Sequence, residues 1–392
     1  MAKWNRRNFI TAFTSGLFGM GLTKTMRSDS IKLNNLVETE DIKIKKYNIL
    51  GKTGLKVSDV SCGAISFFEP NVMRYAFDLG VNYFDTAESY MNTNSERYIG
   101  QALSGIRDKV IITTKHGYSS RTKITRQNII NRMENSLKRM KTDYVDIALV
   151  HGINDLKLLH NEELLSAYSQ LKKDGKIRFT GFSTHNATVT LKQALDSDFT
   201  QVILVIYSHM QNEIEPLLEQ VKKKGIGVIA MKIFAGGKHG NLKSFIGRET
   251  SYPQAAIRWV LRNPNIDTCI ATMSSYSHVE EYVAASGLSL DRADLNVLAR
   301  YQHLVDDQYC RVGCEECLNA CPNNVPINDV LRYSMYFEDY KMEKEAIRYY
   351  AKIDDKIKPY SCVSCDGICS NACPYGLKVR ENIIRANEIL SA

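Results

Sequence analysis

The sequence lacks several features that would assign it at once to a familiar class. After residue 28, no apolar run reaches the roughly 20 residues that span a bilayer, so we expect no integral membrane span beyond that point. The 51 Lys and Arg residues exceed the 43 Asp and Glu residues, but they are dispersed and not interleaved with aromatics, which argues against a nucleic-acid partner. The G-x-G-x-x-G turn of dinucleotide-binding open sheets is also missing, because the first candidate strand runs into Cys62-Gly63-Ala64-Ile65-Ser66.

Cysteine is almost absent from the first 309 residues. Only Cys62 and Cys269 occur there, each in an apolar run, and we expect both to be core thiols. The other eight of the ten cysteines form two groups with similar spacing, each closed by a proline. These groups are Cys310-x3-Cys314-x2-Cys317-x3-Cys321-Pro322 and Cys362-x2-Cys365-x3-Cys369-x3-Cys373-Pro374. The end of the chain is therefore chemically unlike the rest.

The first 28 residues have the pattern of a targeting segment. Arg6 and Arg7 precede an uncharged stretch from Asn8 to Thr23, as in signals of the twin-arginine export route. Asn5 stands where that signal usually has Ser or Thr, and no clear cleavage site follows, so a disordered or amphipathic tail is the alternative. We expect a signal-like segment over 1–28, a polar linker over 29–45, and a periplasmic or exported protein, with a cytoplasmic one as the alternative.

The middle of the chain, over 46–290, alternates short apolar runs with amphipathic ones. A hairpin is expected around Gly51-Lys52-Thr53-Gly54. Eight strand–helix units in about 240 residues, with nearly continuous apolar strands, favour an α/β fold, a closed (β/α)8 barrel. The expected strands are Val57–Cys62, Val81–Asp85, Val110–Lys115, Tyr144–His151, Phe179–Ser183, Gln201–Tyr207, Gly227–Lys232 and Thr268–Thr272. The expected helices include Thr125–Met140, Glu162–Lys173, Ala187–Leu195, Ile214–Lys224 and Tyr252–Leu261.

Four polar residues close successive apolar strands. Asp85, Lys115, His151 and Ser183 are separated by about one strand–helix unit each. Because all strands of such a barrel are parallel, these side chains are expected at the carboxyl-end rim, where such barrels carry their active sites.

Tyr90 lies five residues past Asp85 and completes a set with recognisable chemistry. A free Tyr has a pKa of about 10, which a neighbouring Lys115 ammonium is expected to lower. Asp85 would keep that lysine charged, and His151 would hydrogen-bond a carbonyl oxygen. The set predicts a proton donor aimed at an oxygen that becomes negative during hydride reduction.

Several ordered motifs resemble those of the aldo-keto reductases. They are Gly80-Val81-Asn82-Tyr83-Phe84-Asp85-Thr86-Ala87-Glu88-Ser89-Tyr90, Ser95-Glu96-Arg97-Tyr98-Ile99-Gly100-Gln101-Ala102-Leu103, Thr113-Thr114-Lys115, Asp143-Tyr144-Val145-Asp146-Ile147-Ala148-Leu149-Val150-His151 and Gly175-Lys176-Ile177-Arg178-Phe179-Thr180-Gly181-Phe182-Ser183. The resemblance implies a barrel that uses NADPH or NADH, with Tyr90 as general acid, Lys115 and Asp85 tuning it, and His151 orienting the carbonyl. It also implies that Ser183 holds the carboxamide and that Tyr207 stacks on the nicotinamide. The remaining cofactor-binding candidates are Lys232, Gly237, Thr272, Ser274 and Ser275.

The sequence also departs from this family. Thr184-His185 stands where an Asn often follows the serine, and Leu204 stands where a Gln is common. The loop after the eighth strand, 272–278, has no Arg or Lys, which leaves the choice between NADPH and NADH open.

The cysteine groups favour two [4Fe-4S] clusters in an α-helical ferredoxin-like domain over 291–392, with two helices over 327–353. Two zinc sites and disulfides are the alternatives. Because the fourth cysteine of such runs ligates the other cluster, we expect crossed ligand sets. The first set is Cys310, Cys314, Cys317 and Cys373, and the second is Cys362, Cys365, Cys369 and Cys321.

Two functional hypotheses follow. The first is an NAD(P)H-dependent oxidoreductase that interconverts a carbonyl and an alcohol, with a small-molecule substrate and an external redox partner for the clusters. The second is an electron-transfer or ligand-binding module without nicotinamide turnover. Hydride transfer moves two electrons whereas iron–sulfur clusters pass one, and no flavin motif is evident to split the pair.

Overall fold

The computed structural model describes residues 42–66, 69–118, 124–154, 156–236 and 250–391. The predicted signal segment, most of the predicted linker and Gly237 lie outside the described residues. Residues 41–392 form one compact unit by their contacts. Among the described residues, no helix combines the length and apolarity required to cross a membrane.

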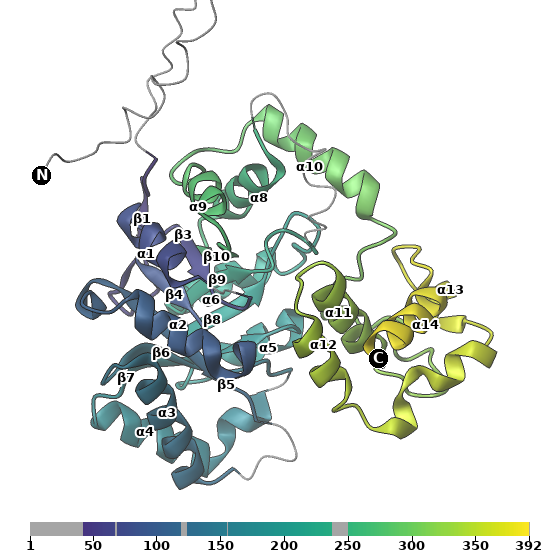
Figure 1. Ribbon diagram of the computed structural model, residues 1–392, viewed down its shortest axis with the longest axis horizontal. Coiled ribbons are helices and arrows are strands. Elements are labelled where there is room, and N and C mark those ends of the chain that lie inside the picture. The colour runs from purple at the N-terminus through teal and green to yellow at the C-terminus, as the bar shows by residue number, and fades with distance from the viewer. Residues whose placement is uncertain (1–41, 67–68, 119–123, 155, 237–249, 392) are drawn as a thin grey trace, which may run out of the picture. The chain divides into compact units, whose positions relative to one another are not determined.

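Eight parallel strands close into a barrel, which confirms the predicted (β/α)8 architecture (Figure 1). Around the barrel the order is β10-β3-β4-β5-β6-β7-β8-β9, so neighbours in sequence are neighbours in space. The strands are β3 Val60–Gly63, β4 Tyr83–Asp85, β5 Ile111–His116, β6 Val145–Val150, β7 Ile177–Thr184, β8 Val202–Ile206, β9 Gly227–Met231 and β10 Thr268–Thr272. Most of their residues are buried, as expected for strands covered on both faces.

The predicted hairpin precedes the barrel. β1 Tyr47–Ile49 pairs antiparallel with β2 Lys56–Ser58. The strand expected over Val57–Cys62 is thereby divided, because Asp59 interrupts it. The buried Asp59 carboxylate accepts hydrogen bonds from the Ser286 hydroxyl at 2.6 Å and from the Gly287 amide at 2.9 Å. These bonds tie the hairpin to the end of the last barrel unit.

Helices follow the strands and cover the outside of the barrel (Figure 1). Several begin at side chains that cap free backbone amides, including Thr125, Asn161 and Ser251. The barrel helices are α1 Pro70–Asp78, α2 Asn94–Ala102, α3 Arg126–Met140, α4 Glu162–Lys173, α5 Ala187–Ala194, α6 Glu215–Lys224, α8 Tyr252–Leu261 and α9 Tyr276–Val283. The later helices are α10 Arg292–Val305, α11 Ile327–Glu338, α12 Glu343–Tyr350, α13 Ile368–Asn371 and α14 Val379–Leu390.

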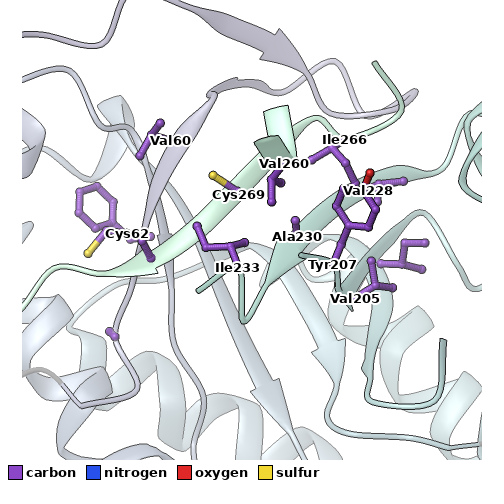
Figure 2. Close-up of a cluster of buried hydrophobic side chains, with 14 of the residues drawn as sticks. Val60, Cys62, Val205, Tyr207, Val228, Ala230, Ile233, Val260, Ile266 and Cys269 are labelled. Atoms are coloured by element: carbon purple, nitrogen blue, oxygen red, sulfur yellow. The ribbon is translucent and has the colours of Figure 1, made fainter. Parts of the chain in front are cut away.

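The layer between strands and helices is apolar. Figure 2 shows part of it, where Val205, Tyr207 and Cys269 lie among other buried side chains. Cys62 and Cys269 are both fully buried, which confirms that they are core thiols. Burial raises the pKa of the Cys62 thiol to about 12, so it stays protonated and unreactive near neutral pH.

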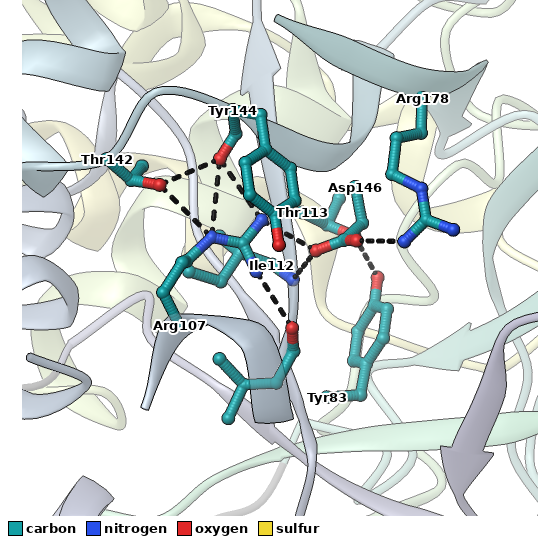
Figure 3. A network of polar contacts seen from close by, with 9 residues as sticks. Tyr83, Arg107, Ile112, Thr113, Thr142, Tyr144, Asp146 and Arg178 are labelled. Carbon is teal, nitrogen blue, oxygen red and sulfur yellow. Dashed lines mark hydrogen bonds and ion pairs between the residues drawn. The ribbon is translucent and has the colours of Figure 1, made fainter. Parts of the chain in front are cut away.

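A polar network lies near the amino ends of the strands, opposite the predicted site (Figure 3). The buried Asp146 carboxylate pairs with Arg107 and with Arg178, each at 2.8 Å. Its Oδ2 atom also accepts the Ile112 amide at 3.0 Å. The network joins β5 to β6 and β7. It lies at the amino-end face, which in such barrels serves stability, whereas the opposite face carries the chemistry.

The barrel core continues beyond the predicted domain boundary at 290. Helix α10 contributes Val297, Leu298 and Tyr301 to the barrel's main hydrophobic cluster. The buried Asp294, in the first turn of α10, forms an ion pair with Arg258 of α8. A separate cluster of buried residues, including Val330, Tyr336 and Ile383, forms the core of the cysteine-rich tail. The two predicted helices over 327–353 are present as α11 and α12.

Candidate active site

A cavity of about 890 Å³ opens at the carboxyl ends of the barrel strands. Asp85, Tyr90, Lys115, His151 and Ser183 all line it. The structure therefore brings together the strand-end residues and the tyrosine that the sequence spacing singled out.

Asp85 and Lys115 form a buried ion pair across neighbouring strands. The Lys115 Nζ atom donates to Asp85 Oδ2 and to the Thr86 carbonyl oxygen, each at 2.6 Å. Burial raises the pKa of Asp85 and lowers that of Lys115, and the mutual attraction opposes both shifts. Asp85 Oδ1 is buried without a hydrogen-bond partner in the described structure, so the pair keeps one acceptor unused.

Tyr90 follows a tight loop whose backbone is held by neighbouring strands. The Tyr90 amide donates to the Ala87 carbonyl at 3.0 Å, and the Glu88 amide donates to the Lys115 carbonyl at 3.1 Å. The next three residues, 91–93, all have positive φ, a conformation that costs non-glycine residues energy and clusters at functional sites. The Lys115 ammonium lies 4.8 Å from the centroid of the Tyr90 ring.

The pKa of Tyr90 moves opposite to the sequence-based expectation. Burial, with the nearby Asp85 charge, raises the pKa of this phenol well above its ordinary value of 10. The expected lowering by Lys115 is therefore wrong for this environment, because desolvation of a phenolate outweighs the attraction of an ammonium already paired with Asp85.

His151 lies against Tyr90 at the rim. The two ring centroids are 5.6 Å apart and the rings are nearly perpendicular. The Ser89 hydroxyl lies 3.5 Å from His151 Nδ1. Burial lowers the pKa of His151 to about 3, helped by the positive charges of Lys115 and Arg332, so this imidazole is neutral near pH 7.

The candidate cofactor residues are only partly brought to the cavity. Lys232, Thr272 and Ser274 line it with Ser183, whose hydroxyl accepts the Gly152 amide at 2.9 Å. Ser275 does not line it, because its side chain caps α9 by accepting the His278 amide. Gly237 lies outside the described residues.

Tyr207 is not at the cavity, which corrects its predicted stacking role. Alternate residues of a strand face opposite sides, and Tyr207 shares the outer face of its strand with Val205 (Figure 2). Its hydroxyl bonds to Glu215 and Asn263, and its ring lies 5.2 Å from that of Trp259. The alternation of inward Leu204 with outward Val205 is a sequence signal that could have excluded this role.

Sequence reasoning missed several residues that line the cavity. Met231, at the end of β9, shares the inward face with Ile229. His185 follows β7, and its pKa is lowered well below the ordinary value by burial and by the charge of Arg332. Other lining residues come from the tail, which was expected to line the pocket, but no local pattern indicated which of its residues do so: Arg332, Tyr333, Tyr336, Asp339, Tyr340, Lys341 and Tyr349.

The eight tail cysteines form two sets, each around its own small cavity. One cavity is lined by Cys310, Cys314, Cys317 and Cys373, and the other by Cys321, Cys362, Cys365 and Cys369. All eight are free thiols. In the described residues no group of three or more His, Cys, Asp or Glu is close enough to hold a single metal ion.

Comparisons with known proteins agree with the fold. Residues 68–245 match the model of the aldo/keto reductase family. L-galactose dehydrogenase of Arabidopsis thaliana is 32% identical over 63% of this chain and 91% of its own length. Methylglyoxal reductase YeaE of Escherichia coli is 28% identical over 59% of this chain and 83% of its own length.

A solved structure supports the same assignment. The aldo/keto reductase of Klebsiella pneumoniae in complex with NADP and acetate is 26% identical, with a TM-score of 0.56 over 67% of this chain and 95% of that one. The named relatives are a dehydrogenase and reductases, which are oxidoreductases. The chain therefore belongs to the aldo/keto reductase family and is an oxidoreductase.

Proposed function

We propose that this protein uses NADP(H) to interconvert a carbonyl and an alcohol, with Tyr90 as the proton donor. The observation that carries the proposal is the convergence of Asp85, Tyr90, Lys115 and His151 on one cavity. The Klebsiella pneumoniae relative binds NADP, which supports the choice of cofactor.

The cavity fits a nicotinamide cofactor in size and in the polar groups at its wall. Ser183, Thr272 and Ser274 would hold it. A bound nicotinamide supplies the hydride that reduces a carbonyl carbon.

The protein's own residues would bind and protonate the carbonyl oxygen of the substrate. The neutral His151 ring orients the carbonyl by a hydrogen bond, and the Tyr90 hydroxyl donates its proton as negative charge develops on that oxygen. The raised pKa of Tyr90 keeps the phenol protonated near pH 7. Near pH 7 the phenol is therefore in the protonated form that carbonyl reduction requires, whereas alcohol oxidation would use the phenolate as base.

The test compares wild type with Tyr90→Phe in steady-state NADPH oxidation across a panel of carbonyl compounds. We expect kcat to fall by about 100-fold or more, because general acid catalysis contributes about that much. Binding of NADPH, followed by its fluorescence, should remain. Equal rates for the two proteins would contradict the role of Tyr90, and two equally inert proteins would favour the binding module.

We further propose that the two cysteine sets hold one [4Fe-4S] cluster each, in the crossed arrangement. The first set, for example, combines Cys310, Cys314 and Cys317 from one run with Cys373 from the other around a common cavity. Burial, together with the neighbouring thiols, raises the pKa of Cys310 to about 12, as expected for buried sulfurs that surround one cavity. Loaded clusters would pass single electrons, which implies an external redox partner.

Cys373→Ser tests the crossed arrangement after anaerobic purification. We expect about half the iron to be lost, together with the EPR signal of one cluster. Double substitution of Cys373 and Cys310 should lose no further iron, because both residues serve the same cluster. Double substitution of Cys373 and Cys369 should remove nearly all the iron. A protein that contains only zinc would overturn the proposal.

We also propose export by the twin-arginine route, on the pattern of Arg6, Arg7 and the uncharged stretch after them. Export of a folded protein would carry cofactor and clusters already bound. Fractionation of cells that express wild type or the Arg6→Lys, Arg7→Lys double variant tests it. Equal distribution of the two proteins between fractions would contradict the proposal.

A further inference from the structure

The tail places two cationic side chains and a phenol at the wall of the active-site cavity. Lys232 comes from the end of β9, whereas Arg332 and Tyr336 lie one turn apart on α11 of the tail. All three line the same cavity as Tyr90 and His151.

Lys232 and Tyr336 are in direct contact. The Lys232 Nζ atom lies 3.2 Å from the Tyr336 hydroxyl and 5.0 Å from the centroid of its ring. Among the described residues, Lys232 makes no ion pair with a carboxylate. Its positive charge is therefore available to a ligand in the cavity.

Arg332 keeps part of its guanidinium unused. One terminal nitrogen lies 2.6 Å from His185 Nδ1, and the other donates to Asp329 at 2.7 Å. The Nε atom is buried and has no hydrogen-bond partner in the described structure. A buried donor without a partner is costly, and a ligand that accepts this hydrogen bond would remove the cost.

The positive charges of Lys232 and Arg332 affect the pKa values of Tyr336, His151 and His185. Lys232 and Arg332 lower the pKa of Tyr336, although burial acts in the opposite direction. The same two cations also lower the pKa values of His151 and His185, after burial. Asp339 and Glu281 also line the cavity, but neither carboxylate is among the causes of these three shifts.

We propose that Arg332, Lys232 and Tyr336 form an anion-binding subsite that selects carbonyl substrates carrying a carboxylate. This inference rests on the proposed function and deepens it. A carboxylate can accept hydrogen bonds from guanidinium, ammonium and hydroxyl groups at once, and such charge-assisted bonds are the strong ones. A phosphate of the cofactor offers the same chemistry, so the experiment must separate the two sources.

The experiment measures kcat/KM for a 2-oxo acid and for its neutral amide at saturating NADPH. Wild type is expected to prefer the acid. In Arg332→Met the ratio of acid to amide should fall about 30-fold, as for a lost hydrogen bond to a charged group. Tyr336→Phe, which removes only the hydroxyl, should lower the ratio by a smaller factor.

Arg348→Met is the matched control, since it removes the same charge from an exposed position on the neighbouring α12. The ratio should stay at the wild-type value in this variant. Circular dichroism of each variant checks that the tail has folded.

Calorimetric binding of the acid and the amide to the NADP-loaded protein tests the subsite without turnover. Tighter binding of the acid than of the amide, with the difference diminished in Arg332→Met, supports the subsite. This holds even if the protein catalyses the reduction of neither compound, in which case only the proposed function fails. Equal binding of the two compounds overturns the subsite. A higher Kd for NADPH in Arg332→Met, with an unchanged ratio of kcat/KM for the acid to that for the amide, also overturns the subsite. That result assigns the cations to the cofactor phosphate.

Discussion

At the scale of single residues, the site depends on a charge pair removed from water. Lys115 and Asp85 are each 1% exposed. In the described structure the Lys115 ammonium has hydrogen bonds only to Asp85 and to the Thr86 carbonyl, and the Asp85 carboxylate has one only from Lys115. Removing one partner from such a pair leaves the other charge uncompensated, which is strongly destabilising. The same pair orients the lysine over the Tyr90 ring, so the stability of the fold and the catalysis proposed above would depend on the same contact.

Asp85→Asn should therefore lower both stability and activity. We expect the free energy of unfolding to fall by about 3 kcal/mol, because the Lys115 ammonium stays buried without its counter-charge. Urea denaturation gives the stability, and NADPH oxidation gives the rate.

Glu219→Gln is the control for this change, because the pair between Glu219 and Lys223 is exposed on α6. An exposed pair of this kind contributes less than about 1 kcal/mol. If Asp85→Asn were no more destabilising than Glu219→Gln, the buried pair would not have the role assigned to it.

At the scale of elements, one face of α11 connects a cysteine set to the cavity. Asn328, Arg332 and Tyr336 are spaced by four residues, so they lie on the same side of the helix. Asn328 Nδ2 lies 3.6 Å from Cys310 Sγ, Arg332 contacts His185, and Tyr336 contacts Lys232. A change in this helix would therefore reach the cysteines and the active site together.

Gly313 brings the tail close to the rim of the barrel. Its φ is +86°, and a Cβ atom there would lie only 1.9 Å from the His185 carbonyl oxygen. Gly313→Ala should thus displace the cysteine loop from the barrel. We expect faster hydrogen exchange in α11 and weaker substrate binding, because Arg332 and Tyr336 move with the helix.

Gly376→Ala is the matched control for this substitution. Gly376 also has a positive φ of +69°, but no heavy atom lies within 4 Å of the Cβ position. It introduces the backbone strain without the clash. Equal exchange rates in α11 for the two variants would show that the close approach at Gly313 does not hold the tail.

At the scale of the whole molecule, folding buries histidines in their neutral form. Burial lowers the pKa of His116 to about 4, from an ordinary value near 6.5. Between these values the unfolded chain binds a proton that the folded chain does not, so stability is lost as the pH falls below about 6.5. His209, lowered to about 4, and His151, lowered to about 3, act in the same sense.

The free energy of unfolding should therefore decrease between pH 7.5 and pH 5.5, with about 1 kcal/mol of the loss from His116. Urea denaturation at both pH values measures it. His116→Gln, whose amide can still reach the Ser136 hydroxyl, should show a smaller decrease. An identical decrease in wild type and variant would exclude His116 as a contributor.

The sequence alone determined the barrel and much of its rim. Apolar strands that alternate with amphipathic helices predict a parallel sheet buried on both faces, and eight such units without the glycine turn of open sheets favour the closed form. Parallel strands then bring Asp85, Lys115 and His151 to one end. The spacing of the cysteines likewise predicted which four surround each small cavity. These features follow from local periodicity and from the geometry of neighbouring strands.

Other features were decided only by the tertiary structure. The sign of the Tyr90 shift depends on how completely the phenol is buried, which no spacing reveals. Tyr207 lies on the outer face of its strand, and Met231 reaches the cavity from the next one. Arg332 and Tyr336 meet the barrel across about 100 residues or more of chain, because such contacts depend on how the tail docks rather than on any local pattern.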